Sequence, residues 1–120
     1  MRRYAAVAAL LCLSATAALG QKAAPVRLVG WVSDGHCTTK HMEDGGEICV
    51  RKCIAGATHV DPEWKPGGMV FVTEDRKVWK VDNADALWGY ESRRVEIDGE
   101  LNADRGSVRV AKFIGPKPSK

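Results

Sequence analysis

The sequence lacks a strong excess of charge of either sign. Its 18 Lys+Arg and 15 Asp+Glu give a formal net charge of +3. Two of the arginines, Arg2 and Arg3, lie in the N-terminal segment, and without residues 1–20 the balance is 16 to 15, a net charge of +1. Nucleic-acid-binding domains usually keep a cationic face, whereas the charges here are mixed along the chain. The composition therefore argues against a nucleic-acid partner.

The sequence also lacks an apolar run long enough for a permanent membrane span. Residues 5–19 form an apolar stretch of about fifteen residues, against the roughly twenty that a transmembrane helix needs. The stretch follows two arginines and ends in the small residues of Ala-Leu-Gly, which is typical of a secretory signal peptide. We therefore predict a signal peptide over residues 1–20 and an exported, periplasmic or secreted domain with no membrane span in its mature form.

The four cysteines form none of the familiar paired motifs. Cys12 lies within the signal peptide behind two leucines, whereas a lipoprotein signal has small residues before its cysteine, so we interpret it as part of the removed peptide. The other three, Cys37, Cys49 and Cys53, include no C-x-x-C pair and no C-x-x-C-H string. The missing motifs argue against a thioredoxin-like redox centre and against c-type haem attachment.

What remains is about one hundred residues, enough for one small domain. We place it at residues 26–115, after a short lead over residues 21–25 and before a flexible tail over residues 116–120. Period-two alternation and turn signals predict strands. The predicted strands are 26–34, 69–74, 77–82, 93–101 and 107–114.

Two helices complete the prediction. Residues 47–56 form a Cys-containing helix that ends at Gly56, and Asn83 caps a short helix over residues 84–90. The resulting order, with a helix between the third and fourth strands, is the connectivity of the five-stranded OB barrel. We therefore predict a mainly β fold: a five-stranded OB-like Greek-key barrel with the Cys-containing helix inserted between its first and second strands. A plain antiparallel sandwich is the alternative, and only closure of the sheet separates the two.

The tryptophans divide by their surroundings. Trp31, Trp79 and Trp88 lie in or beside apolar elements, which favours packing in the core or at the barrel rim over a stacking platform. Trp64, in a proline-rich loop, is the candidate for an exposed contact.

The segment from Asp34 to Cys53 holds three cysteines and two histidines in twenty residues. A helix over residues 47–56 places Cys49 and Cys53 at i and i+4, with Cβ atoms about 5 to 6 Å apart. A disulfide requires about 3.5 to 4.5 Å. Cys49 and Cys53 are therefore not expected to join each other, so a bridge must use Cys37 and leave one thiol free.

One interpretation is a disulfide between Cys37 and Cys53. It would pin the long connection to the barrel and contribute about 3 kcal/mol for a loop of this length. An oxidising compartment favours it, whereas the odd cysteine argues against it.

A second interpretation is a metal site built from Cys37, His41, Cys49 and Cys53. A tetrahedral set of three sulfurs and one nitrogen suits zinc, and sulfur-rich sites also suit Cu(I). The expected result is about one equivalent of metal in the purified protein. His36 is an alternative nitrogen donor, whereas His59, beyond the helix, is interpreted as a loop residue.

A third interpretation is thiol chemistry at Cys49 or Cys53. Either thiol would need a lowered pKa, and Arg51 and Lys52 are cations close in sequence. No pattern places a base beside a nucleophile, and no catalytic residue is predicted. Asp34 is interpreted as the residue that caps the turn before Cys37, or as an acceptor that orients a histidine.

The mature chain resembles a set of small exported bacterial domains of unknown function with an OB-like barrel. Their members read roughly Gly-x-x-x-Asp-x-x-Cys, then His, then Cys-x-x-x-Cys followed by a Gly-Ala-like pair, and end in a Val-x-Val/Ile-x-Gly strand. The matching positions cover about residues 26–114 and are Gly30, Asp34, Cys37, His41, Cys49, Cys53, Gly56-Ala57, Val95, Ile97 and Gly99. Thr38 stands where the family has glycine. The resemblance implies the fold and one cluster of the four Cys/His residues, and it implies no known reaction.

Together these observations predict an exported binding or interaction module of the cell envelope. Its ligand or envelope-protein partner is unknown, because a nearly neutral domain shows no preference among peptide, glycan or no ligand. A soft metal ion, zinc or copper, is the cofactor that the Cys/His cluster suggests.

Overall fold

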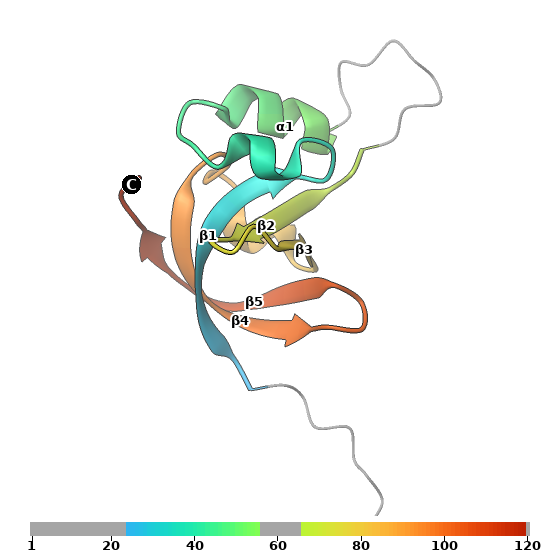
Figure 1. Ribbon diagram of the computed structural model, residues 1–120, viewed down its shortest axis with the longest axis vertical. Coiled ribbons are helices and arrows are strands. Elements are labelled where there is room, and N and C mark those ends of the chain that lie inside the picture. The colour runs from blue at the N-terminus through green and yellow to red at the C-terminus, as the bar shows by residue number, and fades with distance from the viewer. Residues whose placement is uncertain (1–23, 56–65, 120) are drawn as a thin grey trace, which may run out of the picture.

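The structure is a computed structural model that describes residues 24–55 and 66–119 (Figure 1). The predicted signal peptide, the first part of the lead, His59 and Trp64 lie outside the described residues. The elements are β1 (Val26–Asp34), the 3₁₀ helix η1 (Thr38–His41), α1 (Glu47–Ala55), β2 (Met69–Thr73), β3 (Val78–Val81), the 3₁₀ helix η2 (Ala84–Leu87), β4 (Arg94–Asn102) and β5 (Ser107–Pro116). The predicted strands are confirmed, and so is the Cys-containing helix over Glu47–Ala55, whereas its predicted end at Gly56 lies outside the described residues.

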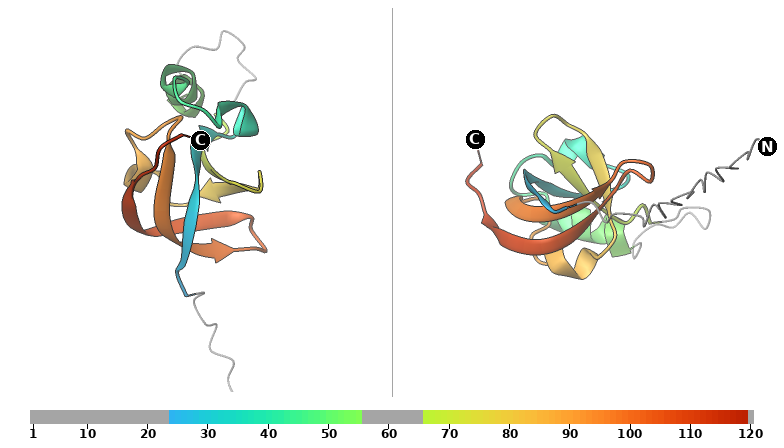
Figure 2. Two further views of the ribbon diagram at one scale, coloured as in Figure 1. Left: turned by 60° about the vertical axis from the view of Figure 1, so that its left-hand side comes forward. Right: turned by 90° about the horizontal axis from the view of Figure 1, so that it is seen from below.

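The five strands form one mixed sheet that closes on itself in the order β1-β2-β3-β5-β4. β1 pairs antiparallel with β2 on one side and with β4 on the other. Two parallel pairs, Lys80 with Ser107 and Val81 with Val108, join β3 to β5 and complete the ring. Figure 2 shows this ring from below in its right-hand view. The sheet is therefore one closed ring and not the two facing sheets that the sandwich alternative predicted.

Gly30 lies where β1 passes from one partner strand to the other. It is opposite Val95 of β4 and also opposite Thr73 of β2. A Cβ atom at this position would lie 2.4 Å from the Val72 carbonyl oxygen and 2.9 Å from the Phe71 ring. The bend of β1 that lets one strand serve both sides of the ring therefore requires glycine here.

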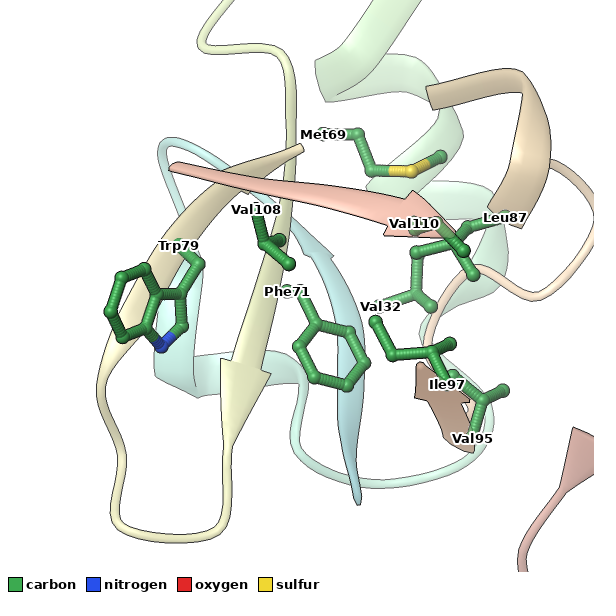
Figure 3. Close-up of a cluster of buried hydrophobic side chains, with 9 residues drawn as sticks. All are labelled: Val32, Met69, Phe71, Trp79, Leu87, Val95, Ile97, Val108 and Val110. Atoms are coloured by element: carbon green, nitrogen blue, oxygen red, sulfur yellow. The ribbon is translucent and has the colours of Figure 1, made fainter. Parts of the chain in front are cut away.

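The core fills the inside of the ring (Figure 3). Inward side chains of β4 and β5 alternate with exposed or partly exposed ones, as the period-two pattern predicted. Phe71 is fully buried at the centre, and burial of a side chain of this size contributes about 1.5 to 3 kcal/mol. The buried cluster consists of Val32, Met69, Phe71, Trp79, Leu87, Val95, Ile97, Val108 and Val110.

The two helices that follow β1, η1 and α1, lie at one end of the ring. Both η1 and α1 sit over the end of β1 in Figure 1, and the left-hand view of Figure 2 agrees. α1 buries Val50 fully and packs Ile54 against the core. None of the helices within the described residues has the length and apolar character needed to cross a bilayer.

Two predictions about the connection from β3 to β4 are wrong. The side chain of Asn83 does not cap the following helix. Its amide donates to the Val110 carbonyl at 2.9 Å and its oxygen accepts from the Val110 amide at 2.8 Å, so it pairs with β5 instead. Trp31 and Trp79 are buried as predicted, but Trp88 follows the short η2 and is 52% exposed.

The outer face of β4 carries ion pairs. Arg27 Nε lies 2.6 Å from Asp98, and Lys117 Nζ lies 2.8 Å from Glu96. The hydrogen bonds from these cations hold the pKa of each carboxyl below its usual value. Ser119, in the segment predicted as a flexible tail, donates a hydrogen bond to Asp44. The flexibility of that tail stays a prediction.

Candidate metal centre

Asp34, the last residue of β1, organises the turn that carries the first cysteine. Its side chain is fully buried. One carboxylate oxygen, Oδ1, accepts hydrogen bonds from the backbone amides of His36 and Cys37, both at 2.9 Å. Aspartate commonly forms such local bonds with the backbone after it. The predicted capping role of Asp34 is therefore confirmed, and it fixes Cys37 at the end of the ring.

Thr38 turns the chain from Cys37 into η1. Its φ is +45°, in the left-handed region where a side chain is unfavourable. The hydroxyl of Ser33 donates to the Thr38 carbonyl at 2.7 Å and helps to hold this conformation. The requirement for positive φ explains why glycine is expected at this place. η1 then brings His41 back over the same end of β1.

Ser92, just before β4, fixes the loop between η1 and α1. Its hydroxyl donates to the Glu43 carbonyl at 2.5 Å and accepts from the Gly46 amide at 3.1 Å. Gly46 also packs closely on the imidazole, because a Cβ there would lie 2.5 Å from His41 Nδ1. Ser92 therefore positions the start of α1 and the histidine together.

Glu91 fixes α1 itself. Its carboxylate is fully buried, accepts from the Gly89 amide at 3.0 and 3.1 Å, and pairs with Arg51 Nε at 3.1 Å. Arg51 is thus directed to Glu91, although the sequence suggested it as a cation that activates a thiol. Sequence analysis missed Glu91 and Ser92, because nothing in the pattern around them distinguishes them from ordinary polar loop residues.

These anchors bring five side chains into two overlapping groups of possible metal ligands. In the first, donor atoms of Cys37, His41 and Cys49 lie within 4.8 Å of one another. In the second, donor atoms of Asp34, Cys37 and Cys53 do so. Cys37 belongs to both groups. All four predicted residues are therefore brought together, whereas His36 belongs to neither group among the described residues.

The three cysteines of the cluster are free in the structure. Cys49 and Cys53 are not joined, as their spacing on α1 predicted. The alternative bridge between Cys37 and Cys53 is not formed either. Asp34 holds the turn that carries Cys37, and Glu91 holds the helix that carries Cys53, so the two sulfurs remain separate donors. Cys12 lies outside the described residues.

Asp34 contributes a donor that the sequence did not reveal. Its second carboxylate oxygen, Oδ2, is buried and has no hydrogen-bond partner. A buried carboxylate oxygen without a partner is costly. The short distance from Asp34 to the thiols of Cys37 and Cys53 makes a bound cation the natural partner.

Two thiols of the cluster are poor nucleophiles in the metal-free protein. Burial raises the pKa of the Cys53 thiol to about 12, and the Asp34 carboxylate adds to the rise. Burial and Asp34 also raise the pKa of Cys37. A redox-active thiol requires the opposite shift. The thiol-chemistry interpretation is therefore not supported at Cys53, and at Cys49 it stays a prediction.

We predict that alkylation of Cys53 in the metal-free protein keeps accelerating above pH 9. An unfolded cysteine has a pKa of about 8.5, so its alkylation rate levels off just above that pH. In the folded protein the thiol is only half ionised at pH about 12, so the thiolate fraction is still rising there. Iodoacetamide labelling followed by mass spectrometry measures each site, because trypsin separates Cys49 from Cys53 at Arg51 and Lys52.

The same protein unfolded in urea is the control, and its Cys53 should level off near pH 9. A folded-state plateau at that pH would contradict the raised pKa. The pKa of Cys53 is higher in the folded protein than in the unfolded chain. This thiol therefore makes its full contribution to folding stability below pH about 8.5. That contribution is lost as the pH rises toward 12.

No family model, curated protein or solved structure matches this chain. The resemblance of residues 26–114 to small exported bacterial domains therefore stays a prediction. What this chain does must follow from the chemistry of its own residues.

Proposed function

We propose that this protein is a small exported binding module that holds zinc at the cluster of Asp34, Cys37, His41, Cys49 and Cys53. One observation carries the proposal: side chains from the end of β1, from η1 and from α1 converge into two ligand groups that share Cys37. The three elements are held over the end of the ring because Ser92 binds the loop before α1 and Glu91 binds α1 itself.

The distances fit zinc. Zinc binds sulfur at about 2.3 Å and nitrogen or oxygen at about 2.0 to 2.2 Å, so two ligand atoms of one tetrahedral ion lie about 3.3 to 3.8 Å apart. The donor atoms of each group lie within 4.8 Å, and a small side-chain rotation brings them into range. A carboxylate beside imidazole and thiolate favours zinc over Cu(I), which prefers soft ligands alone.

The fold that presents this site is, we propose, an OB-like Greek-key barrel. Supporting features are the strand order around the ring, the shared first strand and the short helix η2 between β3 and β4. The signal-peptide pattern of residues 1–20 supports export. Zinc would then cross-link the long connection between β1 and β2. A domain this small gains stability from such a cross-link.

We predict that protein purified under reducing conditions binds zinc, and that His41→Ala or Cys49→Ala lowers the amount bound. Each substitution removes one donor from the same group. Zinc content is measured by elemental analysis, and affinity by competition with a chromogenic chelator. His36→Ala, which removes the neighbouring histidine, is the matched control and should bind zinc like the unchanged protein.

Copper loaded under reducing conditions serves as the comparison metal, and its binding should depend on the three thiols and not on Asp34. Protein that remains metal-free in buffered zinc, with three titratable thiols, would refute the proposed function. A single disulfide and one free thiol would instead favour the stapled domain.

A further inference from the structure

We propose that the cluster holds two divalent ions bridged by the Cys37 thiolate, with Asp34 as a ligand of the inner ion. This inference rests on the proposed zinc site and goes beyond it in stoichiometry and in the role of Asp34. The inner ion takes Asp34, Cys37 and Cys53, and the outer ion takes Cys37, His41 and Cys49.

The Asp34 carboxylate divides its two oxygens between two tasks. Oδ1 accepts the backbone amides of His36 and Cys37 and so shapes the turn. Oδ2 makes no hydrogen bond, although the side chain is 0% exposed. A turn-forming residue alone would need one oxygen, and asparagine would serve as well. The unpartnered buried oxygen therefore indicates a cation in contact with it.

The donors fall into two groups of different depth. Asp34 is fully buried and Cys53 is partly buried, whereas Cys49 is exposed and His41 is partly buried. Cys37 lies between them and belongs to both groups. A thiolate has lone pairs for two metal ions, so a shared cysteine with different partners on each side suits a bridging ligand.

Charge balance favours two ions over one. When metal binds, the three thiols and the carboxylate together supply four negative charges, and the imidazole supplies none. One divalent ion in the inner group would leave one excess negative charge beside the fully buried Asp34, because that group supplies three anionic ligands, whereas two divalent ions balance all four charges. Arg51, a cation on α1, pairs with Glu91.

Each ion then has three protein ligands, and zinc commonly completes four with a water or another small ligand. The outer ion adjoins the exposed Cys49. Its fourth position is therefore the one that solvent or a small ligand reaches first.

The test is a zinc titration of the metal-free protein, read by competition with a chromogenic chelator, together with NMR of the cadmium-loaded protein. We expect two equivalents of zinc and two cadmium resonances that split each other through the shared sulfur. Asp34→Asn should bind one equivalent and show one resonance, because asparagine keeps the Oδ1 acceptor of the turn and removes the anionic Oδ2.

His41→Ala should also retain one equivalent, this time in the inner group. One equivalent in the unchanged protein would overturn the two-ion inference, and two equivalents in Asp34→Asn would overturn the role of Asp34 as a ligand; either result would leave the zinc function standing. No binding at all would remove both.

Discussion

Cys37→Ser should abolish the stabilisation of this protein by zinc. Cys37 is the one donor common to both ligand groups, so its loss removes a thiolate from every ion that the cluster holds. A ligand that binds only the folded state stabilises it by about 4 kcal/mol when its free concentration is a thousand times the dissociation constant. In a domain of this size each kcal/mol shifts Tm by roughly 4 to 8 °C.

The expected result is therefore a rise in Tm of roughly 16 °C or more for the unchanged protein in a zinc buffer, and no rise for Cys37→Ser. The measurement is thermal unfolding followed by circular dichroism, with and without zinc. Cys49→Ser is the comparison variant and should keep part of the rise, because it leaves the group of Asp34, Cys37 and Cys53 complete.

Without zinc, Cys37→Ser and the unchanged protein should unfold at similar temperatures, since serine nearly matches cysteine in size. This comparison separates loss of the metal from damage to the fold. A full zinc-dependent rise in Cys37→Ser would mean that Cys37 is not a ligand.

Gly30→Ala should destabilise the ring by about 3 kcal/mol, at the upper end of what overpacking usually costs. The added Cβ would lie 2.4 Å from a backbone oxygen, that of Val72, which cannot rotate away as a side chain would. The change acts where β1 pairs with β2 and β4 together. A loss of this size is a large fraction of the stability of a small domain.

The measurement is the free energy of unfolding in urea, with a chelator present so that zinc does not contribute. Gly115→Ala in β5 is the matched control, because nothing lies within 4 Å of its added Cβ and its φ is not positive. It should change stability by less than about 1 kcal/mol. Equal stabilities for the two variants would show that the close approach at Gly30 can relax.

The strands could be predicted because each carries its own alternating pattern. In β4, Val95 and Ile97 are buried while Glu96 and Asp98 are only partly covered, so the period of two is visible without any partner. The helix α1 could also be predicted from local sequence, because the segment 47–56 is apolar at helical spacing and ends at a glycine. The pairing that closes the ring is different, because it depends on contacts between residues more than twenty positions apart.

Part of the site could be predicted because it also depends on local sequence. Cys49 and Cys53 are related by helix geometry, which local sequence determines. The role of Asp34 as a donor could not be found this way, because a turn-capping aspartate looks the same whether or not its second oxygen has a partner. Glu91 and Ser92 are distant from the cluster in the sequence, and only the fold brings them into contact with α1 and the loop before it.

The anchoring of the connection by residues 91 and 92 sets an order of events in biosynthesis. A ribosome makes residues 34 to 53 well before it makes Glu91 and Ser92, which hold α1 and its preceding loop in place. Until then the three thiols belong to a nascent segment without its supports, open to oxidation and to mispairing. The five side chains can therefore take their folded arrangement only after Glu91 and Ser92 have been made.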